Sequence, residues 1–164
     1  MVALDGVLPE VIVGRLLKQR GLTLALAESC TGGLVSHRVT NVPGSSNYYL
    51  GSVTAYANEI KERILRVQPE TLRRYGAVSE RTALEMAHGV RLLFHADLGL
   101  SVTGVAGPGG GTPEKPVGLT YTALAAPDLE RAERYLWNGD RAENKARSAG
   151  TVLDLLLRYL EGRL

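Results

Sequence analysis

The fold of this chain is set by residues 22–40, whose sequence is LTLALAESCTGGLVSHRVT. Positions 22–27 are a short apolar run typical of a buried strand, and 34–40 carry the pattern of a helix. Residues 28–33 join them in a tight turn that contains two glycines. Apolar residues of helical spacing also lie over 8–20, so the first unit is predicted as helix, strand, turn and helix.

The rest of the chain continues to mix helices and strands. Further strands are predicted at 48–57, 98–103, 117–125 and 132–136. Further helices are predicted at 59–65 with Asn58 as N-cap, at 69–75, after Ser79 as far as Phe94, and at 141–160. No change in composition marks a domain boundary. The fold class is therefore predicted as α/β, a single domain over 1–164 in which helices cover a mixed central sheet.

Composition and charge restrict the function. The chain of 164 residues is 45% hydrophobic and can bury a core of its own. It has one cysteine, Cys30, and its histidines lack metal-ligand spacing, so we expect no disulfide, no metal and no cofactor. A net charge of +2 is too balanced to indicate a nucleic-acid partner or an anionic membrane. Without a signal-peptide pattern or an apolar segment of spanning length, a cytoplasmic location is expected.

Three common catalytic motifs do not fit the sequence. The glycine-rich loop 104–111 lacks the Gly-Lys-Ser/Thr ending of a phosphate-binding P-loop, because Thr112 and Pro113 follow it. It also lacks the G-x-G-x-x-G spacing of dinucleotide-binding turns. The residues around Ser29 lack both glycines of a G-x-S-x-G elbow, and a serine–histidine triad is disfavoured.

Ser29 is the candidate nucleophile. It follows the apolar strand where the chain turns into a helix, and backbone N–H groups at such a turn are unpaired. The amides of Thr31, Gly32 and Gly33 are therefore expected to stabilise an oxyanion when the Ser29 hydroxyl attacks a carbonyl carbon. The alternative is that Ser29 or Thr31 only caps the helix, and spacing alone leaves both interpretations open.

Lys61 is the candidate base for Ser29, since a lysine can accept the hydroxyl proton when its amine is neutral. With Asn58 as N-cap, Lys61 would be the third residue of a helix, where the helix dipole disfavours a cation. Tyr56, at the end of the preceding strand, could hydrogen-bond both groups and position the proton. The alternative is a solvated lysine beside a packed tyrosine.

The segment 103–118 is a candidate ligand-binding loop. It holds six glycines, which pack little and let the backbone approach a ligand closely. Backbone N–H groups in such loops commonly face an anion or a planar ligand, and Lys115 could add a phosphate contact. A plain surface loop is the alternative.

Four blocks of residues together resemble one known family. They are AESCTGG at 27–33, Tyr56 with Asn58 and Lys61, GAVSE at 76–80, and TGVAGPGG at 103–110 with KPVG at 115–118. The blocks occur in order over about residues 8–160. They are similar to the C-terminal domain of the CinA family, the nicotinamide-nucleotide amidohydrolases (NMN deamidases).

The resemblance implies a Ser–Lys hydrolase of pyridine nucleotide salvage, which converts nicotinamide mononucleotide to nicotinic acid mononucleotide and ammonia. It implies Ser29 as nucleophile, Lys61 as general base and Tyr56 as its partner, in a homo-oligomer built on dimers. The oxyanion and substrate site that it implies consists of Thr31, Gly32, Gly33, Thr103, Gly104, Gly107, Gly109, Gly110, Lys115, Arg141 and Lys145. Lys145 departs from the arginine usual at its position, which keeps a charge for the substrate phosphate but loses the two-pronged geometry. The rival hypothesis is a module that binds a pyridine nucleotide, or a partner in competence or recombination, without turnover.

Overall fold

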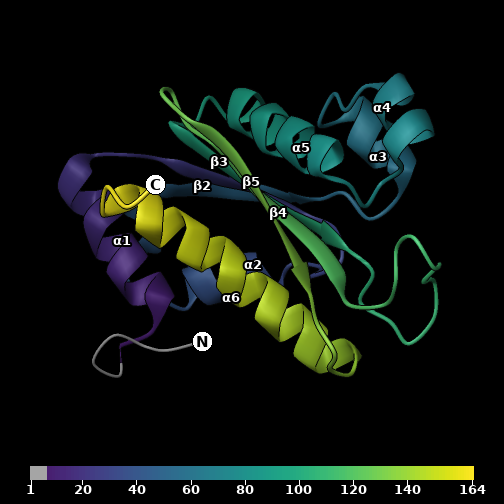
Figure 1. The fold of residues 1–164 in the computed structure, drawn as a ribbon. Coiled ribbons are helices and arrows are strands. Elements are labelled where there is room, and N and C mark those ends of the chain that lie inside the picture. The colour runs from purple at the N-terminus through teal and green to yellow at the C-terminus, as the bar shows by residue number, and fades with distance from the viewer. Residues whose placement is uncertain (1–6) are drawn as a thin grey trace.

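A five-stranded mixed sheet forms the centre of the computed structural model, which describes residues 7–164 (Figure 1). The strands are β1 (Leu24–Glu28), β2 (Tyr49–Thr54), β3 (Leu98–Gly104), β4 (Leu119–Ala125) and β5 (Glu130–Leu136). Their order is β2-β1-β3-β4-β5; β1 pairs in parallel with β2 and β3, and β4 pairs antiparallel with β3 and β5. The predicted single α/β domain with a mixed sheet is thereby confirmed.

Helices cover both faces of the sheet (Figure 1). One layer consists of α1 (Pro9–Arg20), α2 (Leu34–Thr40) and α6 (Arg141–Leu160). The opposite layer consists of α3 (Asn58–Arg63), α4 (Pro69–Tyr75) and α5 (Glu80–Leu93). A short 3₁₀ helix, Ser45–Asn47, precedes β2.

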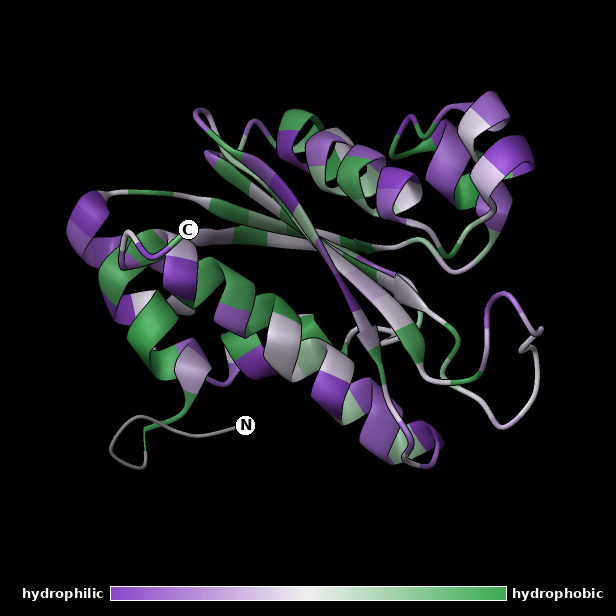
Figure 2. Ribbon diagram, in the orientation of Figure 1, coloured by the Kyte–Doolittle hydropathy of each residue, from purple (hydrophilic) through white to green (hydrophobic). Residues whose placement is uncertain are grey.

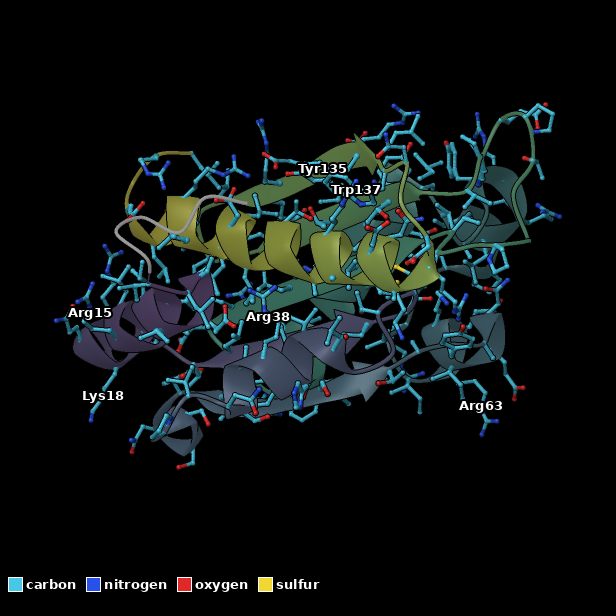
Figure 3. All side chains as sticks on the ribbon, turned by 90° about the horizontal axis from the view of Figure 1, so that it is seen from below. Arg15, Lys18, Arg38, Arg63, Tyr135 and Trp137 are labelled. Atoms are coloured by element: carbon cyan, nitrogen blue, oxygen red, sulfur yellow. The ribbon has the colours of Figure 1, made fainter. Side chains whose placement is uncertain are left out.

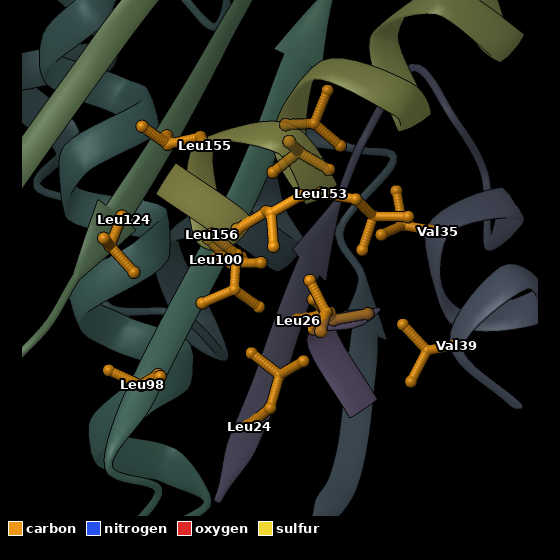
Figure 4. Packing of buried hydrophobic residues seen from close by; sticks show 14 of the residues in the cluster. Leu24, Leu26, Val35, Val39, Leu98, Leu100, Leu124, Leu153, Leu155 and Leu156 are labelled. Atoms are coloured by element: carbon orange, nitrogen blue, oxygen red, sulfur yellow. The ribbon is translucent and has the colours of Figure 1, made fainter. Parts of the chain in front are cut away.

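The side chains of β1 alternate between the two helix layers. Leu24 and Leu26 pack in the core beneath α1, α2 and α6, whereas Ala25 and Ala27 join the core beneath α5. Figure 4 shows the leucine-rich side, where residues of β1, β3, β4, α2 and α6 meet. The helices turn their apolar faces to the sheet and their polar faces outward (Figure 2). The alternating pattern of β1 therefore supplies both halves of the core.

Charged side chains mark the outside of the helix layers (Figure 3). Arg15, Lys18 and Arg63 are exposed and point away from the protein. Arg38 of α2 is instead largely buried, and its Nη2 lies 2.7 Å from Glu10 Oε2 of α1. This ion pair joins two helices of one layer. No helix within residues 7–164 is both long enough and apolar enough to span a membrane.

The helix boundaries agree with the sequence prediction for α2 and α6 but differ at α3. This helix begins at Asn58 because Ala57 holds the extended N-cap backbone, so the predicted capping role of Asn58 is wrong. Ser79 caps α5 as predicted, since its hydroxyl accepts a bond from a first-turn amide at 3.2 Å. Asp140 and Glu143 form a capping box at the start of α6, a signal that the sequence analysis did not use.

The chain reverses its direction across the sheet between β1 and β3. After β1 it passes through α2 to β2 on one side, and it then returns through the opposite helix layer to β3 on the other. In open α/β sheets, ligands bind at the carboxyl ends of the strands where such a reversal occurs. Ser29 follows β1 at this point. The topology therefore places the candidate nucleophile where a ligand is expected.

Candidate active site

Ser29 and Lys61 meet at the carboxyl ends of β1 and β2. The Lys61 Nζ donates a hydrogen bond to the Ser29 Oγ over 3.1 Å. It also donates to the Ala55 carbonyl at 2.7 Å and approaches the Tyr56 carbonyl at 3.4 Å. Lys61 is only 1% exposed, so the alternative of a solvated lysine is wrong. The two groups are close enough for direct proton transfer.

Backbone bonds hold this pair in place. The Ala55 amide donates to the Glu28 carbonyl at 2.8 Å, and the Ser29 amide donates to the Val102 carbonyl at 2.9 Å. A closed ring results, because Ser29 bonds to Lys61, Lys61 to Ala55, and Ala55 to the residue that precedes Ser29. The ring links the ends of β1 and β2. The sheet itself therefore sets the distance between the hydroxyl and the amine.

Burial lowers the pKa of the Lys61 amine below its ordinary value. The bonds of Nζ go to a hydroxyl and to carbonyls, none of which carries the negative charge that would offset lost hydration. The sequence left burial or nearby positive charge as ways to lower the pKa of a lysine base, and it singled out the first turn of a helix for Lys61. In the structure Lys61 is the fourth residue of the six-residue α3 and lies in its last turn, so burial is the cause instead.

Cys30 is next to the candidate nucleophile but is unsuited to replace it. Burial raises the pKa of its thiol to about 12. Because the thiolate is the reactive form of cysteine, a thiol that stays protonated at neutral pH is inert. The hydroxyl of Ser29, with its amine partner, is the better nucleophile.

A cavity of about 220 Å³ opens beside the Ser29 hydroxyl. Ala77, Val78 and Ala106 give it apolar walls, and Thr103 lies between them with its hydroxyl donating to the Ala77 carbonyl at 2.8 Å. Two larger hollows in the described surface, of about 510 and 830 Å³, are lined by no serine, cysteine or lysine. The smaller cavity is therefore the one of these three that contains the serine–lysine pair.

Tyr56 and Arg141 meet at the edge of this cavity. The Arg141 guanidinium donates to the Tyr56 hydroxyl at 3.0 Å and to the Gly107 carbonyl at 2.6 Å. Tyr56 is 61% exposed, and its phenol bonds to Arg141 instead of to Ser29 or Lys61. The structure thus brings Tyr56 to the site without the two-way bond expected from the sequence.

The interpretation of Ser29 or Thr31 as helix caps is wrong. The N-cap of α2 is Gly33, which has no side chain to bond to the helix. The Ser29 hydroxyl bonds to Lys61, and the Thr31 hydroxyl donates to Glu28 Oε2 at 2.6 Å.

The amides expected to hold an oxyanion are only partly available. The Gly32 amide donates to the Ser29 carbonyl at 3.1 Å, and the Gly33 amide donates to a buried carboxylate at 3.0 Å. These two amides stabilise the turn. For the amides of Cys30 and Thr31, residues 7–164 provide no hydrogen-bond acceptor, and Cys30 lines the cavity. Thr31 is fully buried and does not line the cavity, so the Cys30 amide, directly after Ser29, is the free donor on a cavity-lining residue of this turn.

The other predicted pocket residues lie at different distances from the cavity. Gly104 lines it, whereas Gly109 and Gly110 are exposed and do not. Lys145 Nζ lies 3.8 Å from the position that a Cβ on Gly32 would occupy, and is therefore beside the Ser29 turn.

Lys115 does not line the cavity. Its amine donates to the Tyr75 carbonyl, two residues before the wall residue Ala77. Sequence reasoning gave no pocket role to Asn58, Ala77, Val78 or Ala106, which all line the cavity. The signal was present, since all four fall within the blocks that carry the family resemblance.

Replacing Lys61 by methionine should change the pH dependence of stability. The folded-state pKa of Lys61 is lowered, so between that pKa and its ordinary value the unfolded chain binds more protons. The free energy of unfolding of the wild type should therefore rise relative to Lys61→Met as the pH increases from 7 toward 10. Urea denaturation at several pH values measures this difference. A difference that is constant with pH would show that the amine titrates normally.

The fold and the site define an α/β domain that presents a serine–lysine pair at the reversal point of its sheet. The CinA C-terminal domain model matches residues 8–160, and the chain belongs to this family. The assignment to the CinA C-terminal domain family, drawn from the sequence blocks, is confirmed.

Known proteins agree with this assignment. A relative from Caldanaerobacter subterraneus subsp. tengcongensis is 50% identical over 161 residues, which are 98% of this chain and 39% of the relative. A "CinA-like protein" of Thermotoga maritima is 48% identical over 94% of this chain and 38% of its own length. The chain thus spans about two fifths of the curated relatives that it matches.

Solved structures share the fold. The CinA superfamily protein KP700603 from Klebsiella pneumoniae superposes with a TM-score of 0.90 at 30% identity, over 94% of this chain and 96% of that one. The competence/damage inducible protein CihA from Agrobacterium tumefaciens gives a TM-score of 0.85 at 37% identity, over 93% and 95% of the two chains.

Proposed function

We propose that this protein is an amidohydrolase that converts nicotinamide mononucleotide to nicotinic acid mononucleotide and ammonia. The observation that carries the proposal is the buried Lys61 amine, 3.1 Å from the Ser29 hydroxyl in a cavity at the switch point of the sheet. A binding module needs no nucleophile paired with a buried base. The choice of substrate rests on the family resemblance, and the reaction type rests on this pair.

The reaction begins when neutral Lys61 takes the proton of the Ser29 hydroxyl. The Ser29 Oγ forms a bond to the carboxamide carbon, whose oxygen becomes an oxyanion held by the Cys30 amide. The carbon–nitrogen bond then breaks, and Lys61 returns its proton to the departing nitrogen, which leaves as ammonia. Lys61 next takes a proton from water, and the hydroxide attacks the acyl-serine carbon. The ester bond to Ser29 Oγ then breaks, Lys61 returns the proton to Oγ, and nicotinic acid mononucleotide is released.

The chemistry of the substrate suits this site. A positively charged pyridine ring withdraws electrons from its carboxamide and makes the carbonyl carbon easier to attack. The apolar walls fit a flat ring, and the ring cation would further favour the neutral form of Lys61. Arg141 lines the cavity and provides positive charge for a nucleotide phosphate, and Lys145, beside the Ser29 turn, would add to it.

Ammonia release from three substrates separates the candidate functions. The proposal predicts release from nicotinamide mononucleotide, and little from nicotinamide or acetamide, which lack the ring cation and the phosphate. Release from all three would instead indicate an amidase of broader range. Binding of the nucleotide without ammonia would support the binding module and overturn the proposal.

Two serine variants link that activity to the site. Ser29→Ala should reduce ammonia release to background. Ser46→Ala, at an exposed serine of the 3₁₀ helix, is the matched control and should keep full activity. Full activity of a folded Ser29→Ala variant would exclude Ser29 as nucleophile.

A further inference from the structure

Glu28 is a buried acid to which neither the sequence analysis nor the reaction above gives a role. It is the last residue of β1, directly before Ser29, and is 1% exposed. Its Oε2 accepts bonds from the Thr31 hydroxyl at 2.6 Å, the Gly33 amide at 3.0 Å and the Val35 amide at 3.1 Å. A fourth donor, the backbone amide that follows Val35, reaches Oε1 at 2.8 Å. Both oxygens are therefore satisfied by hydrogen-bond donors without an arginine or lysine.

This arrangement differs from ordinary helix capping. A capping side chain normally belongs to the N-cap residue and bonds to an amide two or three positions later. Here the N-cap is Gly33, and the acceptor is five residues upstream, across the turn that carries the nucleophile. The turn from Ser29 to Gly33 must therefore fold around the carboxylate of Glu28.

The carboxylate also determines which amides remain for the reaction. It occupies the amides of Gly33 and Val35, and the Gly32 amide bonds to the Ser29 carbonyl. The amides of Cys30 and Thr31 are the ones in this turn without an acceptor among residues 7–164. The Thr31 hydroxyl bond to Glu28 further fixes the residue that carries one of these two amides.

We propose that Glu28 is a positioning residue, which holds the turn from Ser29 to Gly33 so that the Cys30 amide meets the oxyanion formed on the substrate of Ser29. This inference rests on the proposed function and deepens it. The main-chain carbonyl of Glu28 also accepts from Ala55, whose own carbonyl holds the Lys61 amine. Glu28 therefore contacts the nucleophile turn through its side chain and is linked to the base, by way of Ala55, through its backbone carbonyl.

Glu28→Gln is the direct test, because it keeps the size of the side chain and replaces one acceptor oxygen by an NH₂ group. That group would face an N–H donor, so the turn must shift. The oxyanion exists only in and near the transition state, so kcat should fall about tenfold to 100-fold while KM changes little. The pH midpoint of activity should stay that of the wild type, since Lys61 keeps its partners. Glu10→Gln is the matched control, because Glu10 is the buried acid paired with Arg38 away from the site.

Thr31 provides a second, milder pair of variants. Thr31→Ser keeps the hydroxyl that donates to Glu28 and should keep most of the activity. Thr31→Val has nearly the same shape without the donor, and should lower kcat in the same direction as Glu28→Gln. Equal activity of Thr31→Val and wild type would contradict the role of this bond.

Labelling of Ser29 by a fluorophosphonate separates the positioning role of Glu28 from the choice of substrate. The labelling reaction needs the activated serine and the oxyanion donors but not the nucleotide. We expect labelling about tenfold slower in Glu28→Gln than in wild type and in Glu10→Gln. Unchanged labelling and unchanged kcat in a folded Glu28→Gln variant would overturn the positioning role alone. Normal labelling of a wild type that releases no ammonia from the nucleotide would contradict the substrate, and the labelling ratio would still decide the role of Glu28.

Discussion

Substitution of Lys61 by methionine should lower the rate of ammonia release by a factor on the order of 10²–10⁴, the range for removal of a positioned general base. Methionine fills a similar volume but cannot accept the Ser29 proton. The Lys61 amine is buried and bonded to the Ser29 hydroxyl at 3.1 Å, so no other lysine can replace it. The measurement is steady-state release of ammonia at pH 8.

Two comparisons make this result specific. Lys18→Met removes an exposed lysine of α1 and should leave the rate unchanged. Circular dichroism and a urea midpoint establish that Lys61→Met is folded. A folded Lys61→Met variant within tenfold of the wild-type rate would show that another group deprotonates Ser29.

The second large effect is expected at Gly89, on the face of α5 toward the segment that follows α3. A Cβ at this position would lie 1.8 Å from the Leu65 carbonyl oxygen, which is backbone and cannot turn aside. Alanine should therefore separate α5 from this segment. We expect the free energy of unfolding to fall by about 2–3 kcal/mol, even after the gain of about 1 kcal/mol in helix propensity.

The Gly89→Ala variant should also lose activity, because the displaced segment is bonded to α3. The Val67 amide donates to the Lys61 carbonyl at 3.0 Å, so a shift at Leu65 reaches the base. The control for stability is Gly109→Ala, where a Cβ would meet no atom within 4 Å. That variant should be as stable as the wild type or slightly more stable. Equal stability of Gly89→Ala and wild type would mean that the close helix contact is absent.

Much of the fold follows from periodicity along the chain. The alternation and apolarity of 24–28 and the amphipathic stripe of 141–160 identify β1 and α6, because each element buries one face or both against its neighbours. The cap of α3 could not be predicted from residue type alone. Asn58 is a good capping residue, but the extended N-cap backbone belongs to Ala57, so Asn58 becomes the first residue of the helix. Its side chain lines the cavity instead.

The sequence identified Ser29 and Lys61 as residues of the candidate site, but it did not predict most of the hydrogen bonds that hold them. Ser29 stood out because a strand meets a helix there. Lys61 stood out because the sequence placed it in the first turn of a helix, although the structure places it in the last turn. The burial of Lys61 depends on how the ends of β1 and β2 meet in the folded protein, and the order of residues along the chain does not show this. Glu28 was overlooked for the same reason, since the donors that bond to its carboxylate, three to eight residues downstream, come into reach only when the turn is folded.

Direct titration of the Lys61 amine tests the central claim. The chain has four lysines, Lys18, Lys61, Lys115 and Lys145, so nuclear magnetic resonance of protein labelled at the lysine side chains gives a simple spectrum, with the Lys61 signal assigned by its loss in Lys61→Met. We expect the Lys61 signal to titrate well below the ordinary lysine pKa and at the midpoint of the activity–pH curve. A Lys61 signal that titrates together with that of exposed Lys18 would contradict a neutral lysine base and the reaction built on it.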